Sequence, residues 1–420
     1  MNRLLHTFLK RVMAEGSLEV VDSGGETHRF GNGSGQTIRV RFASPAAERG
    51  VVLHPDLKLG EDYMKGGVVM EAGSIYDLLN LAQTNIQRLK PPWWFGFSAT
   101  YRTLLRRLHQ INTPGRSREN VHHHYDLDGR LYKLFLDDDL QYSCAYFEDG
   151  VTSLDEAQLA KKRHIAAKLD LKPGQRVLDI GSGWGGLGLY LAEHFDVDVT
   201  GVTLSDEQHA VSNRRAEERG LAKRARFILQ DYRSIKGPFD RIVSVGMFEH
   251  VGVNHYRTFF NTCSDLLSAD GSMLLHSIGR FGPPDDTSAF IRKYIFPGGY
   301  IPAISEVMPS VQRSGLKVSD VEILRLHYAK TLRLWRERFL AHKEEVAALY
   351  DEQFVRMWEF YLAGSEMAFR LGDLMNFQLQ LTKDQEVLPL TRNYMLTTEA
   401  SLRDADRIAT DRRPMRLAGE

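Results

Sequence analysis

Residues 177–186 read VLDIGSGWGG, an apolar run that passes directly into a cluster of glycines. A short apolar run followed by a turn signal is typical of a buried strand. Glycine allows a tight turn and a close approach of the backbone to a ligand, which larger residues prevent. Gly181, Gly183 and Gly186 match the G-x-G-x-x-G pattern of nucleotide-binding turns. The stretch therefore predicts a strand, a ligand-binding turn and a helix, in that order.

Strand and helix patterns alternate from Leu169 onward, in segments such as RVLDIGSG, DVTGVTLS, ARFILQDY, DRIVSVGMF and GSMLLHSIG. This alternation predicts an α/β fold, a mostly parallel sheet with helices on both faces that binds its ligand at the carboxyl ends of the strands. After about Thr331 the pattern becomes helical. It carries an apolar stripe that we interpret as core or as a cover over the site, made of Trp335, Phe339, Phe354, Trp358, Tyr361, Leu362 and Phe369.

A nicotinamide or flavin dinucleotide is the first candidate ligand for the glycine turn. The dinucleotide pattern expects an acidic residue at the end of the second strand, but that strand here ends in GVTLS, with Thr203 and Ser205. Asp179 lies instead inside the first strand. Its carboxylate can accept hydrogen bonds from a cationic amino-acid group, or it can serve only to anchor the loop. These residues favour S-adenosylmethionine over a pyrophosphate.

The composition indicates an ordinary globular protein of two domains. The chain has 420 residues, of which 43% are hydrophobic, and its 54 Lys and Arg balance its 54 Asp and Glu. A net charge of zero gives no overall field that favours nucleic acid. Two cysteines are too few for a disulfide framework, and we find neither a signal peptide nor an apolar run long enough to cross a bilayer. We therefore expect a cytoplasmic protein.

The first hundred residues predict a small α+β domain. MNRLLHTFLKRVM places Leu4, Leu5, Phe8, Leu9 and Val12 on one helical stripe, TIRVRFA alternates as a half-buried strand does, and SIYDLLNLAQTNIQRL predicts a second helix. The aromatic segment PPWWFGF follows, and its rings either pack between domains or lie at a lipid interface.

Pro, Gly, Ser and charged residues in INTPGRSRENVHHHY mark a linker. Its consecutive residues His122, His123 and His124 point in alternating directions on an extended chain, so we predict no metal site there. The expected divisions are an N-terminal domain over 1–110 with a possible role in lipid binding, a linker over 111–124, a catalytic domain over 125–395 and a polar tail over 396–420.

A series of motifs occurs in a characteristic order: QYSCAYF, VLDIGSGWGG, GVTLSDEQ, LQDY, DRIVSVGMFEHVG, LLHSIG, KYIFPGGYIP and HYAKTLRLW. This order resembles the cyclopropane and mycolic acid synthase family over roughly residues 126–370, and GEDYMKGG resembles the extra N-terminal domain of the bacterial phospholipid synthases. Ser182 stands where the family often has Cys, a change between small residues that leaves the turn intact. The resemblance implies a Rossmann-like, class I S-adenosylmethionine-dependent methyltransferase domain with helical additions, preceded by the smaller α+β domain.

The resemblance also implies the reaction, which is methyl transfer from S-adenosylmethionine to a cis double bond in an acyl chain of a membrane phospholipid. A carbocation forms at the neighbouring carbon, and a base removes a proton from the added methyl group so that a cyclopropane ring closes. Such a cation requires surroundings that exclude water and yet hold a base close by. In this family the base is a bound bicarbonate ion.

The resemblance assigns the bicarbonate site to Cys144, Glu249, His276, Ile278 and Tyr328. Cys144 and Ile278 contribute main-chain groups, His276 and Tyr328 donate side-chain hydrogen bonds, and Glu249 accepts the hydroxyl proton of bicarbonate. Each residue also has an ordinary structural interpretation: Glu249 could cap the helix that begins near Asn254, and the others could be core side chains.

The donor site falls on the strand ends and their loops. We expect Asp231 to accept a bond from the adenine amino group, and Gln208 to reach the ribose in place of the absent acid. The full set of predicted donor-binding residues is Tyr142, Ser143, Asp179, Gly181, Gly183, Trp184, Gly185, Thr203, Leu204, Gln208, Gln230, Asp231 and Tyr232.

The resemblance further implies a homodimer that contacts the inner face of the membrane peripherally, with no metal and no nucleic acid. Three other functions are also compatible with this sequence. A related enzyme of the same fold could form a methyl- or methylene-branched fatty acid, or it could methylate the nitrogen of a small amine. A lipid-binding protein could also retain a methyltransferase fold that it no longer uses.

Overall fold

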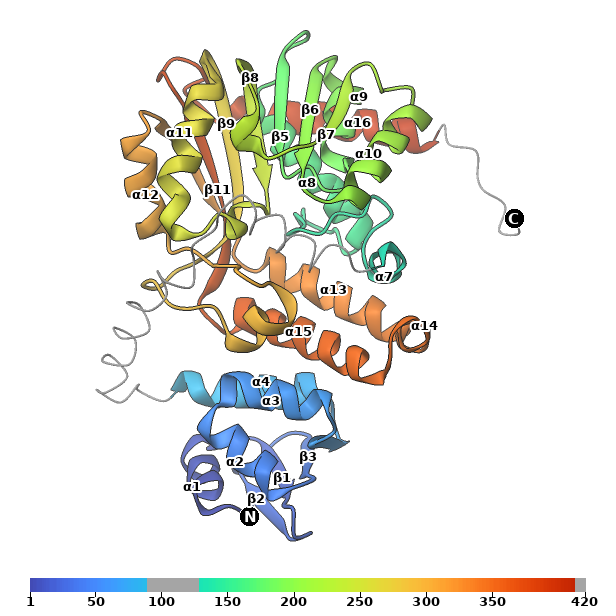
Figure 1. The fold of residues 1–420 in the computed structure, drawn as a ribbon, viewed down its shortest axis with the longest axis vertical. Helices are drawn as coiled ribbons and strands as arrows, with labels where there is room; N and C mark the ends of the chain where they lie inside the picture. The colour runs from blue at the N-terminus through green and yellow to red at the C-terminus, as the bar shows by residue number, and fades with distance from the viewer. Residues whose placement is uncertain (89–127, 412–420) are drawn as a thin grey trace.

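The computed structural model describes residues 1–88 and 128–411. The segment PPWWFGF, the linker 111–124 with its histidines and the expected boundary at residue 110 lie outside the described residues. Figure 1 shows three parts along the long axis: an N-terminal unit, a layer of helices and a large sheet with helices on both faces. Among the described helices, none combines the length and the apolar character that a bilayer span requires.

The N-terminal unit is an α+β fold whose four-stranded sheet has the order β2-β1-β3-β4. The burial of β3 alternates along the strand, as TIRVRFA predicts. In α1, however, Leu5, Leu9 and Val12 are buried while Leu4 and Phe8 are 62% and 40% exposed, so the predicted stripe is only partly core. The elements are α1 (Arg3–Val12), β1 (Ser17–Val21), β2 (Thr27–Phe30), β3 (Thr37–Phe42), α2 (Pro45–Leu53), α3 (Pro55–Met64), β4 (Val68–Ala72) and α4 (Ile75–Arg88).

The large sheet has seven strands in the order β10-β11-β9-β8-β5-β6-β7. Neighbours from β9 through β8, β5 and β6 to β7 pair in parallel, whereas β11 runs antiparallel to both β9 and β10. The predicted mostly parallel α/β sheet is therefore confirmed. Its strands are β5 (Arg176–Ile180), β6 (Asp198–Thr203), β7 (Ala225–Leu229), β8 (Phe239–Val245), β9 (Leu267–Arg280), β10 (Lys317–Ile323) and β11 (Leu374–Thr382).

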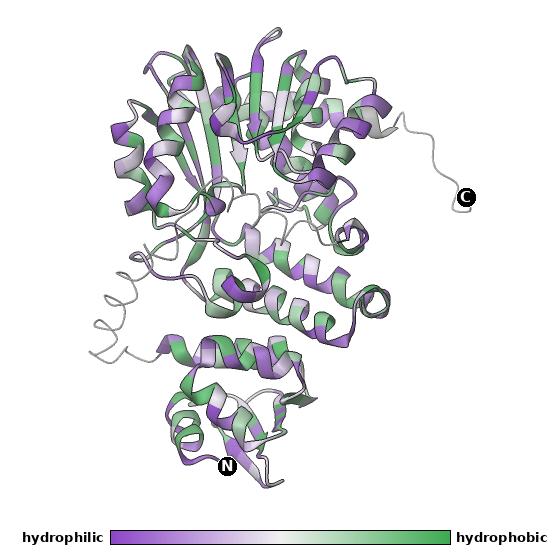
Figure 2. Cartoon of the chain, in the orientation of Figure 1, coloured by the Kyte–Doolittle hydropathy of each residue, from purple (hydrophilic) through white to green (hydrophobic). Residues whose placement is uncertain are grey.

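Both faces of this sheet are buried. Leu178 and Ile180 of β5 pack into one apolar core with α11 (Tyr256–Leu266) and α12 (Ile304–Arg313), whereas Val177 packs into another with α8 (Leu154–Leu169) and α9 (Gly186–Phe195). Figure 2 shows the corresponding hydrophobic colour along the strands. Burial on both faces explains why the strands read as apolar runs in the sequence.

The helical layer lies between the sheet and the N-terminal unit (Figure 1). It consists mainly of α7 (Gly129–Phe135), α13 (His327–Ala341), α14 (Lys343–Leu349) and α15 (Glu352–Arg370). The aromatic stripe predicted after Thr331 lies here: Trp335, Phe339 and Trp358 are buried in one core that extends into the N-terminal unit. A β-carbon at Gly60 of α3 would collide with the rings of Phe290 and Phe360, so glycine permits this close approach.

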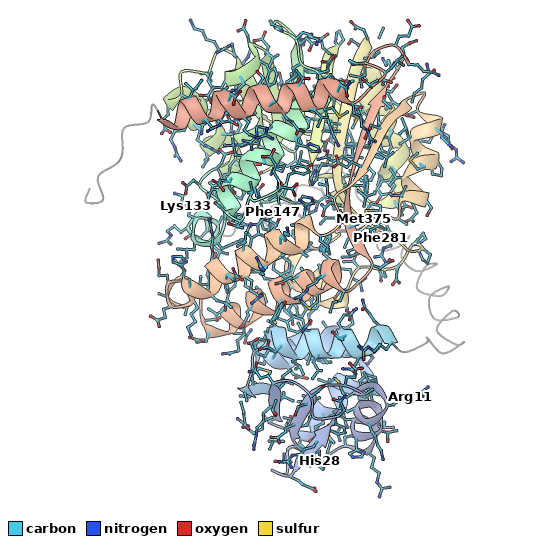
Figure 3. All side chains as sticks on the ribbon, turned by 180° about the vertical axis from the view of Figure 1, so that it is seen from behind. Arg11, His28, Lys133, Phe147, Phe281 and Met375 are labelled. Carbon is cyan, nitrogen blue, oxygen red and sulfur yellow. The ribbon has the colours of Figure 1, made fainter. Side chains whose placement is uncertain are left out.

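The C-terminal residues differ from the expected polar tail. Residues 393–411 form α16 (Asn393–Asp411), which crosses the sheet domain next to α8 (Figure 3). Leu402 lies in the core, and Nη1 of Arg163 donates to Oδ2 of buried Asp406 at 2.9 Å. Leu396 and Ile408 remain exposed, so few apolar residues mark the buried face and the sequence reads as polar. The helix α16 therefore packs against the sheet domain.

Candidate active site

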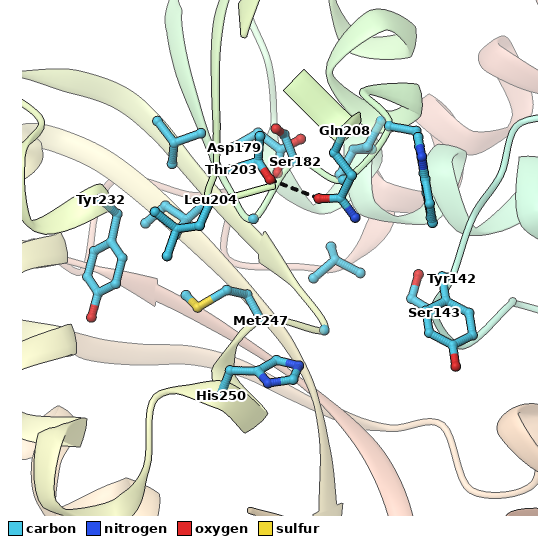
Figure 4. Close-up of a pocket in the computed structure, with 18 of the residues that line it drawn as sticks. Tyr142, Ser143, Asp179, Ser182, Thr203, Leu204, Gln208, Tyr232, Met247 and His250 are labelled. Carbon is cyan, nitrogen blue, oxygen red and sulfur yellow. Dashed lines mark hydrogen bonds between the residues drawn. The ribbon is translucent and has the colours of Figure 1, made fainter. Parts of the chain in front are cut away.

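A cavity lies at the carboxyl ends of β5, β6, β7 and β8 (Figure 4). Figure 4 shows Tyr142 and Ser143 on one side and Tyr232 on the opposite side. Gly185 is the one predicted donor-binding residue that does not line the cavity. The predicted residues that do line it are Tyr142, Ser143, Asp179, Gly181, Gly183, Trp184, Thr203, Leu204, Gln208, Gln230, Asp231 and Tyr232.

The glycine turn follows β5 and forms the floor of the cavity. Gly181 has a φ of +82°, and a β-carbon there would lie 2.7 Å from Cβ of Met247. Gly183 also has a positive φ, and a β-carbon there would meet nothing within 4 Å, so its backbone faces open space. Gly185 instead packs inward, where a β-carbon would lie 2.8 Å from the ring of Phe227. The turn thus combines a conformation that needs glycine with a backbone open to a ligand.

Asp179 is a buried carboxylate at the end of β5, and it lines the cavity. Among the described residues, its Oδ2 has no hydrogen-bond partner. Burial raises the pKa of Asp179 to about 7. A cationic group bound in the cavity would restore the charged form and supply the absent hydrogen bond, which fits the ammonium of S-adenosylmethionine.

Lys161 of α8 also lines the cavity, although it is not among the predicted donor-binding residues. Its Nζ donates to Oε1 of Gln141 and to Oγ of Ser143, each at 2.7 Å. Burial lowers the pKa of Lys161 to about 8. A lysine in a KKR run is ordinarily solvent-exposed, so the sequence carries no local signal for this position.

The ribose and adenine assignments have different surroundings. Thr203 donates to Oε1 of Gln208 at 2.8 Å, which directs the amide nitrogen of Gln208 to other partners such as ribose hydroxyls. Asp231, the predicted adenine partner, accepts from the backbone N and Nε of Arg233 through Oδ1 and from its Nη2 through Oδ2. These bonds hold the pKa of Asp231 below its usual range, mainly through Arg233, although burial opposes the effect.

Glu249 lies in η2 (Phe248–His250), a short 3-10 turn just after β8. Its Oε1 accepts from the backbone N–H of Ile278 at 2.6 Å, so it does not cap the following helix. Its Oε2 is buried without a partner among the described residues. Burial raises the pKa of Glu249 to about 7. The main-chain N–H of Ile278 therefore binds the carboxylate of Glu249. The resemblance assigns a main-chain group of this same residue to bicarbonate.

His276 of β9 is held by a chain of side-chain hydrogen bonds. Nζ of Lys168 donates to Oε1 of Gln378 at 2.7 Å, so the other end of this amide is its NH₂ group, which lies 3.1 Å from Nδ1 of His276. Nδ1 then accepts, and the ring proton resides on Nε2. Burial lowers the pKa of His276 to about 3, so the ring is neutral. Nε2 is buried and has no partner among the described residues.

Cys144 and Tyr328 lie on the side of the helical layer. Cys144 is buried, its Sγ lies 3.3 Å from the carbonyl oxygen of Ala145, and burial raises the pKa of the thiol. The backbone N–H of Ala145 donates to Oγ1 of Thr331, one turn along α13 from Tyr328. Tyr328 is buried with its ring edge against Trp335. The predicted roles of these two residues in anion binding remain predictions.

The five predicted bicarbonate residues do not line the cavity; they are buried or half-buried beside it. Glu249 and Ile278 are in direct contact, and His276 precedes Ile278 by two residues on β9. Lys161 links this group electrostatically to the cavity, because its ammonium influences the pKa values of both Cys144 and His276.

Several other cavity residues were not predicted individually. Met247, His250 and Val251 belong to the quoted motif GMFEHVG, and Pro297 and Gly298 belong to KYIFPGGYIP, so those motifs carried the signal. Gln378 could not be found from the sequence, because it lies 102 positions from His276 and reaches it only across the β9–β11 pair.

Three comparisons place the chain among known proteins. The sequence pattern of the family described as Mycolic acid cyclopropane synthetase matches residues 112–379. The Cyclopropane-fatty-acyl-phospholipid synthase of Escherichia coli (strain K12) is 38% identical over 347 residues, which cover 83% of this chain and 88% of that protein. The Probable fatty acid methyltransferase of Pseudomonas putida is 36% identical over 363 residues, with 82% and 88% covered.

A solved structure shows the same fold. The mycolic acid cyclopropane synthase CmaA1 complexed with SAH and CTAB is 38% identical, with a TM-score of 0.60, and the match covers 63% of this chain and 97% of that chain. The family match over 112–379 includes all the described residues that line the cavity, from Leu140 to Gly298.

Proposed function

This chain belongs to the mycolic acid cyclopropane synthetase family, and from that premise we propose that it converts cis double bonds in phospholipid acyl chains into cyclopropane rings. The family membership makes it an S-adenosylmethionine-dependent methyltransferase of fatty acyl chains. The finer proposal has three parts: the acyl chain belongs to a membrane phospholipid, the product is a ring, and bicarbonate is the base. The name of the E. coli relative supports the first two parts.

The observation that carries the proposal is a pair of buried polar atoms beside the cavity. Oε2 of Glu249 and Nε2 of His276 have no hydrogen-bond partner among the described residues. Buried polar atoms are rarely left unpaired, so each such atom points to an absent partner. The two atoms have opposite characters: the carboxylate oxygen accepts a hydrogen bond, and the imidazole N–H donates one. Bicarbonate satisfies both, because it offers one hydroxyl and two acceptor oxygens.

Glu249 and His276 then determine how bicarbonate is oriented. Glu249 accepts the hydroxyl proton, and His276 donates to one of the other oxygens. Because His276 is neutral and its tautomer is held by Gln378, it supplies this bond without moving a proton. Ile278 keeps Glu249 in place through Oε1. The resemblance adds Cys144 and Tyr328 to the same anion site.

The cavity residues fit S-adenosylmethionine in the same way. The glycine turn offers open backbone at Gly183, Asp179 offers an unpaired carboxylate to the donor's ammonium, and Gln208 offers an amide to the ribose. When bound, S-adenosylmethionine supplies an electrophilic methyl group, and bicarbonate supplies a base. The SAH in the CmaA1 structure supports this choice of donor.

The aromatic residues of the helical layer would protect the reacting acyl chain from water. Tyr142 stacks on Trp335 with ring centroids 5.1 Å apart, and Tyr328 packs edge-on against the same indole. These rings form an apolar wall close to the anion site. A carbocation on the acyl chain would be short-lived in water, so such a wall favours proton removal by the base over hydration.

We also propose that α1 contacts the membrane surface. Leu4 and Phe8 project from it into solvent, and Arg3, Lys10 and Arg11 accompany them in a helix that contains no acidic residue. Figure 3 shows Arg11 at the outer edge of the N-terminal unit. Apolar side chains flanked by cations are typical of helices that lie on anionic bilayers. The resemblance adds to this proposal that the protein is a cytoplasmic homodimer and that the contact is made at the inner face of the membrane.

The experiment that tests the reaction uses the full chain, S-adenosylmethionine and vesicles of a cis-unsaturated phospholipid. We expect each modified acyl chain to gain the mass of one methylene group, together with upfield cyclopropane proton signals. The same mass gain without ring signals would replace the proposal by a methyl- or methylene-branching reaction, which the name of the P. putida relative favours. An absence of turnover would leave the lipid-binding alternative.

A further inference from the structure

Lys161 is a buried cation that the proposed reaction does not use. It is 1% exposed, it lies on α8, and it lines the donor cavity. An ammonium group has three N–H donors. Two of them are directed to Oε1 of Gln141 and Oγ of Ser143, both at 2.7 Å. Both acceptors are neutral, and the carboxylates of Asp137 and Asp139 act on the ammonium only through space, without a hydrogen bond.

The other buried lysines of α8 have carboxylate partners. Lys162 pairs with Asp139 at 2.7 Å, and Lys168 pairs with Glu322. Within the described ranges 1–88 and 128–411, no carboxylate oxygen lies at ion-pair distance from Nζ of Lys161. A buried charge without a counter-ion is strongly disfavoured, so such a charge at the wall of a cavity indicates a ligand of opposite sign.

Asp179 gives the complementary observation at the same cavity. Its Oδ2 is buried and has no partner in the described part of the chain, and the ammonium of Lys161 is close enough to influence its pKa. The two groups do not form an ion pair with each other. The cavity therefore presents one unpaired cation and one unpaired anion, and a ligand that fits both must carry an anion and a cation on neighbouring atoms.

We propose that Lys161 binds the carboxylate of the amino-acid end of S-adenosylmethionine while Asp179 binds its ammonium, an inference that rests on the proposed function. Lys161 is then a specificity-determining residue, because it distinguishes the complete donor from adenosine thioethers that lack the carboxylate. Through Ser143 and Gln141 it also fixes the loop before α8 around that end of the ligand.

The test is isothermal calorimetry at pH 7 with three ligands. S-adenosylhomocysteine carries both charges, its decarboxylated counterpart keeps only the ammonium, and methylthioadenosine carries neither. Lys161→Met should weaken the binding of S-adenosylhomocysteine by about thirtyfold or more, the effect typical of removing one partner of a buried charge pair. It should change methylthioadenosine binding by less than about twofold. The decarboxylated ligand should bind the parent and Lys161→Met with equal affinity, because it has no carboxylate for Lys161 to bind.

Two further variants keep the result interpretable. Lys168→Met removes a buried lysine two turns along the same helix that does not line the cavity. Its bond to Gln378 belongs to the proposed anion site, so this variant is a control for donor binding alone: it should lower the melting temperature but leave S-adenosylhomocysteine binding unchanged. Lys161→Met should not lower the melting temperature of the ligand-free protein, because it removes an ammonium whose burial costs more than its through-space attraction to Asp137 and Asp139 returns. If it fails to fold, Lys161→Gln, which can still bond to Ser143, repeats the ligand series.

Two results would overturn the inference alone. In one, Lys161→Met binds S-adenosylhomocysteine as tightly as the parent does. In the other, it loses S-adenosylhomocysteine and methylthioadenosine equally, which would make Lys161 only a support for Ser143 and Gln141. If the parent protein binds neither S-adenosylhomocysteine nor methylthioadenosine, the result contradicts the proposed function and therefore also this inference.

Discussion

Asp179 and Glu249 are similar carboxylates for which we propose different tasks. Each is buried and has one oxygen without a partner among the described residues, and burial raises the pKa of each to about 7. Asp179 lines the cavity, whereas Glu249 lies beside it and is held by Ile278. On the proposed function, these side chains belong to a donor group and an anion group, and substitutions should affect the two groups independently.

Glu249→Gln tests the anion group. The amide keeps the shape of the side chain, Glu249 itself does not line the cavity, and none of the predicted donor-binding residues lies in η2, so S-adenosylhomocysteine should bind with nearly parental affinity. Turnover should fall by about a hundredfold or more, because an amide orients the bicarbonate hydroxyl poorly. Omitting bicarbonate from the buffer should slow the parent more than the variant. A parallel loss of ligand affinity and activity would place Glu249 in the donor pocket instead.

The pH dependence of stability gives a second test at this residue. The pKa of Glu249 is about 7 in the folded state, above its ordinary value of 4.5. The folded state therefore holds the proton more tightly than the unfolded state does, and the protein loses stability as the pH rises from about 4.5 through about 7. The full penalty above pH 7 is about 3 kcal/mol. Glu249→Gln should therefore melt at a higher temperature than the parent at pH 8, by a margin that shrinks toward pH 4.5. A margin that does not vary with pH would contradict this assignment.

Gln378 should act as a positioning residue for His276. Gln378→Leu removes the donor to Nδ1, so the ring proton is no longer confined to Nε2. We expect a loss of turnover of about tenfold, within the range that one hydrogen bond contributes, with unchanged S-adenosylhomocysteine affinity. Nitrogen NMR of labelled histidine should show the Nε2–H tautomer in the parent and a mixture in the variant. The same tautomer in both proteins would show that Gln378 has no such role.

At the scale of elements, the sequence predicts best where one local pattern determines the structure. The strand β5 and its turn follow from VLDIGSGWGG, and β3 follows from the alternation in TIRVRFA. The same reasoning misses α16, because this helix buries few apolar side chains and relies partly on the pairing of Asp406 with Arg163. Local patterns report burial, whereas ion pairs between distant segments leave no periodic signal.

The candidate site divides in the same way. The donor residues are recognisable because they follow strands and lie in glycine-rich or polar turns. Lys161 and Gln378 are not recognisable, because each is a polar residue in an ordinary helix or strand whose partner is supplied by another element. Their importance depends on burial, which only the assembled fold determines.

The proposed membrane contact of α1 is tested at this scale. Replacing both Leu4 and Phe8 by Ser should reduce binding to anionic vesicles several-fold, because it removes the apolar surface available for insertion. The matched control is Leu390→Ser, which alters a leucine that is 101% exposed in another part of the molecule and should have no effect. Cosedimentation with vesicles at low and high salt measures the binding of the parent, the double variant and the control. Equal binding by all three proteins would exclude α1 as the contact.

At the scale of the whole molecule, the N-terminal unit is fixed to the helical layer by polar contacts as well as by apolar packing. Glu61 of α3 is buried and accepts hydrogen bonds from Lys293 and Tyr294 of η4 (Ile291–Ile295). Tyr76 of α4 donates to Glu366 of α15 at 3.1 Å. Because η4 directly precedes the cavity residues Pro297 and Gly298, the docking of the N-terminal unit supports one wall of the donor cavity.

Glu61→Gln should weaken this docking. Glu61 accepts hydrogen bonds from Lys58 as well as from Lys293. These two lysines lower its pKa to about 2, although burial opposes them. The contribution of Glu61 to stability is therefore present above about pH 4.5 and is lost as the pH falls toward 2. We expect a loss of about 1–3 kcal/mol at pH 7, reduced because water screens the half-exposed lysines. Melting curves at pH 7 and pH 3 should show a smaller difference at pH 3. Glu71→Gln, which alters an ion pair within the N-terminal sheet, is the control.

The position of β11 between β9 and β10 has a consequence for biosynthesis. All the cavity-lining residues in the described part of the chain precede residue 299, but Gln378 emerges 102 positions after His276. At translation rates of 5–20 residues per second, this separation is a delay of roughly 5 to 20 seconds. During that interval β9 is an open sheet edge, and His276 has no partner to choose its tautomer. The nascent chain thus contains all the described cavity residues before it can complete the proposed anion site, and β9 is the strand whose edge waits for β11.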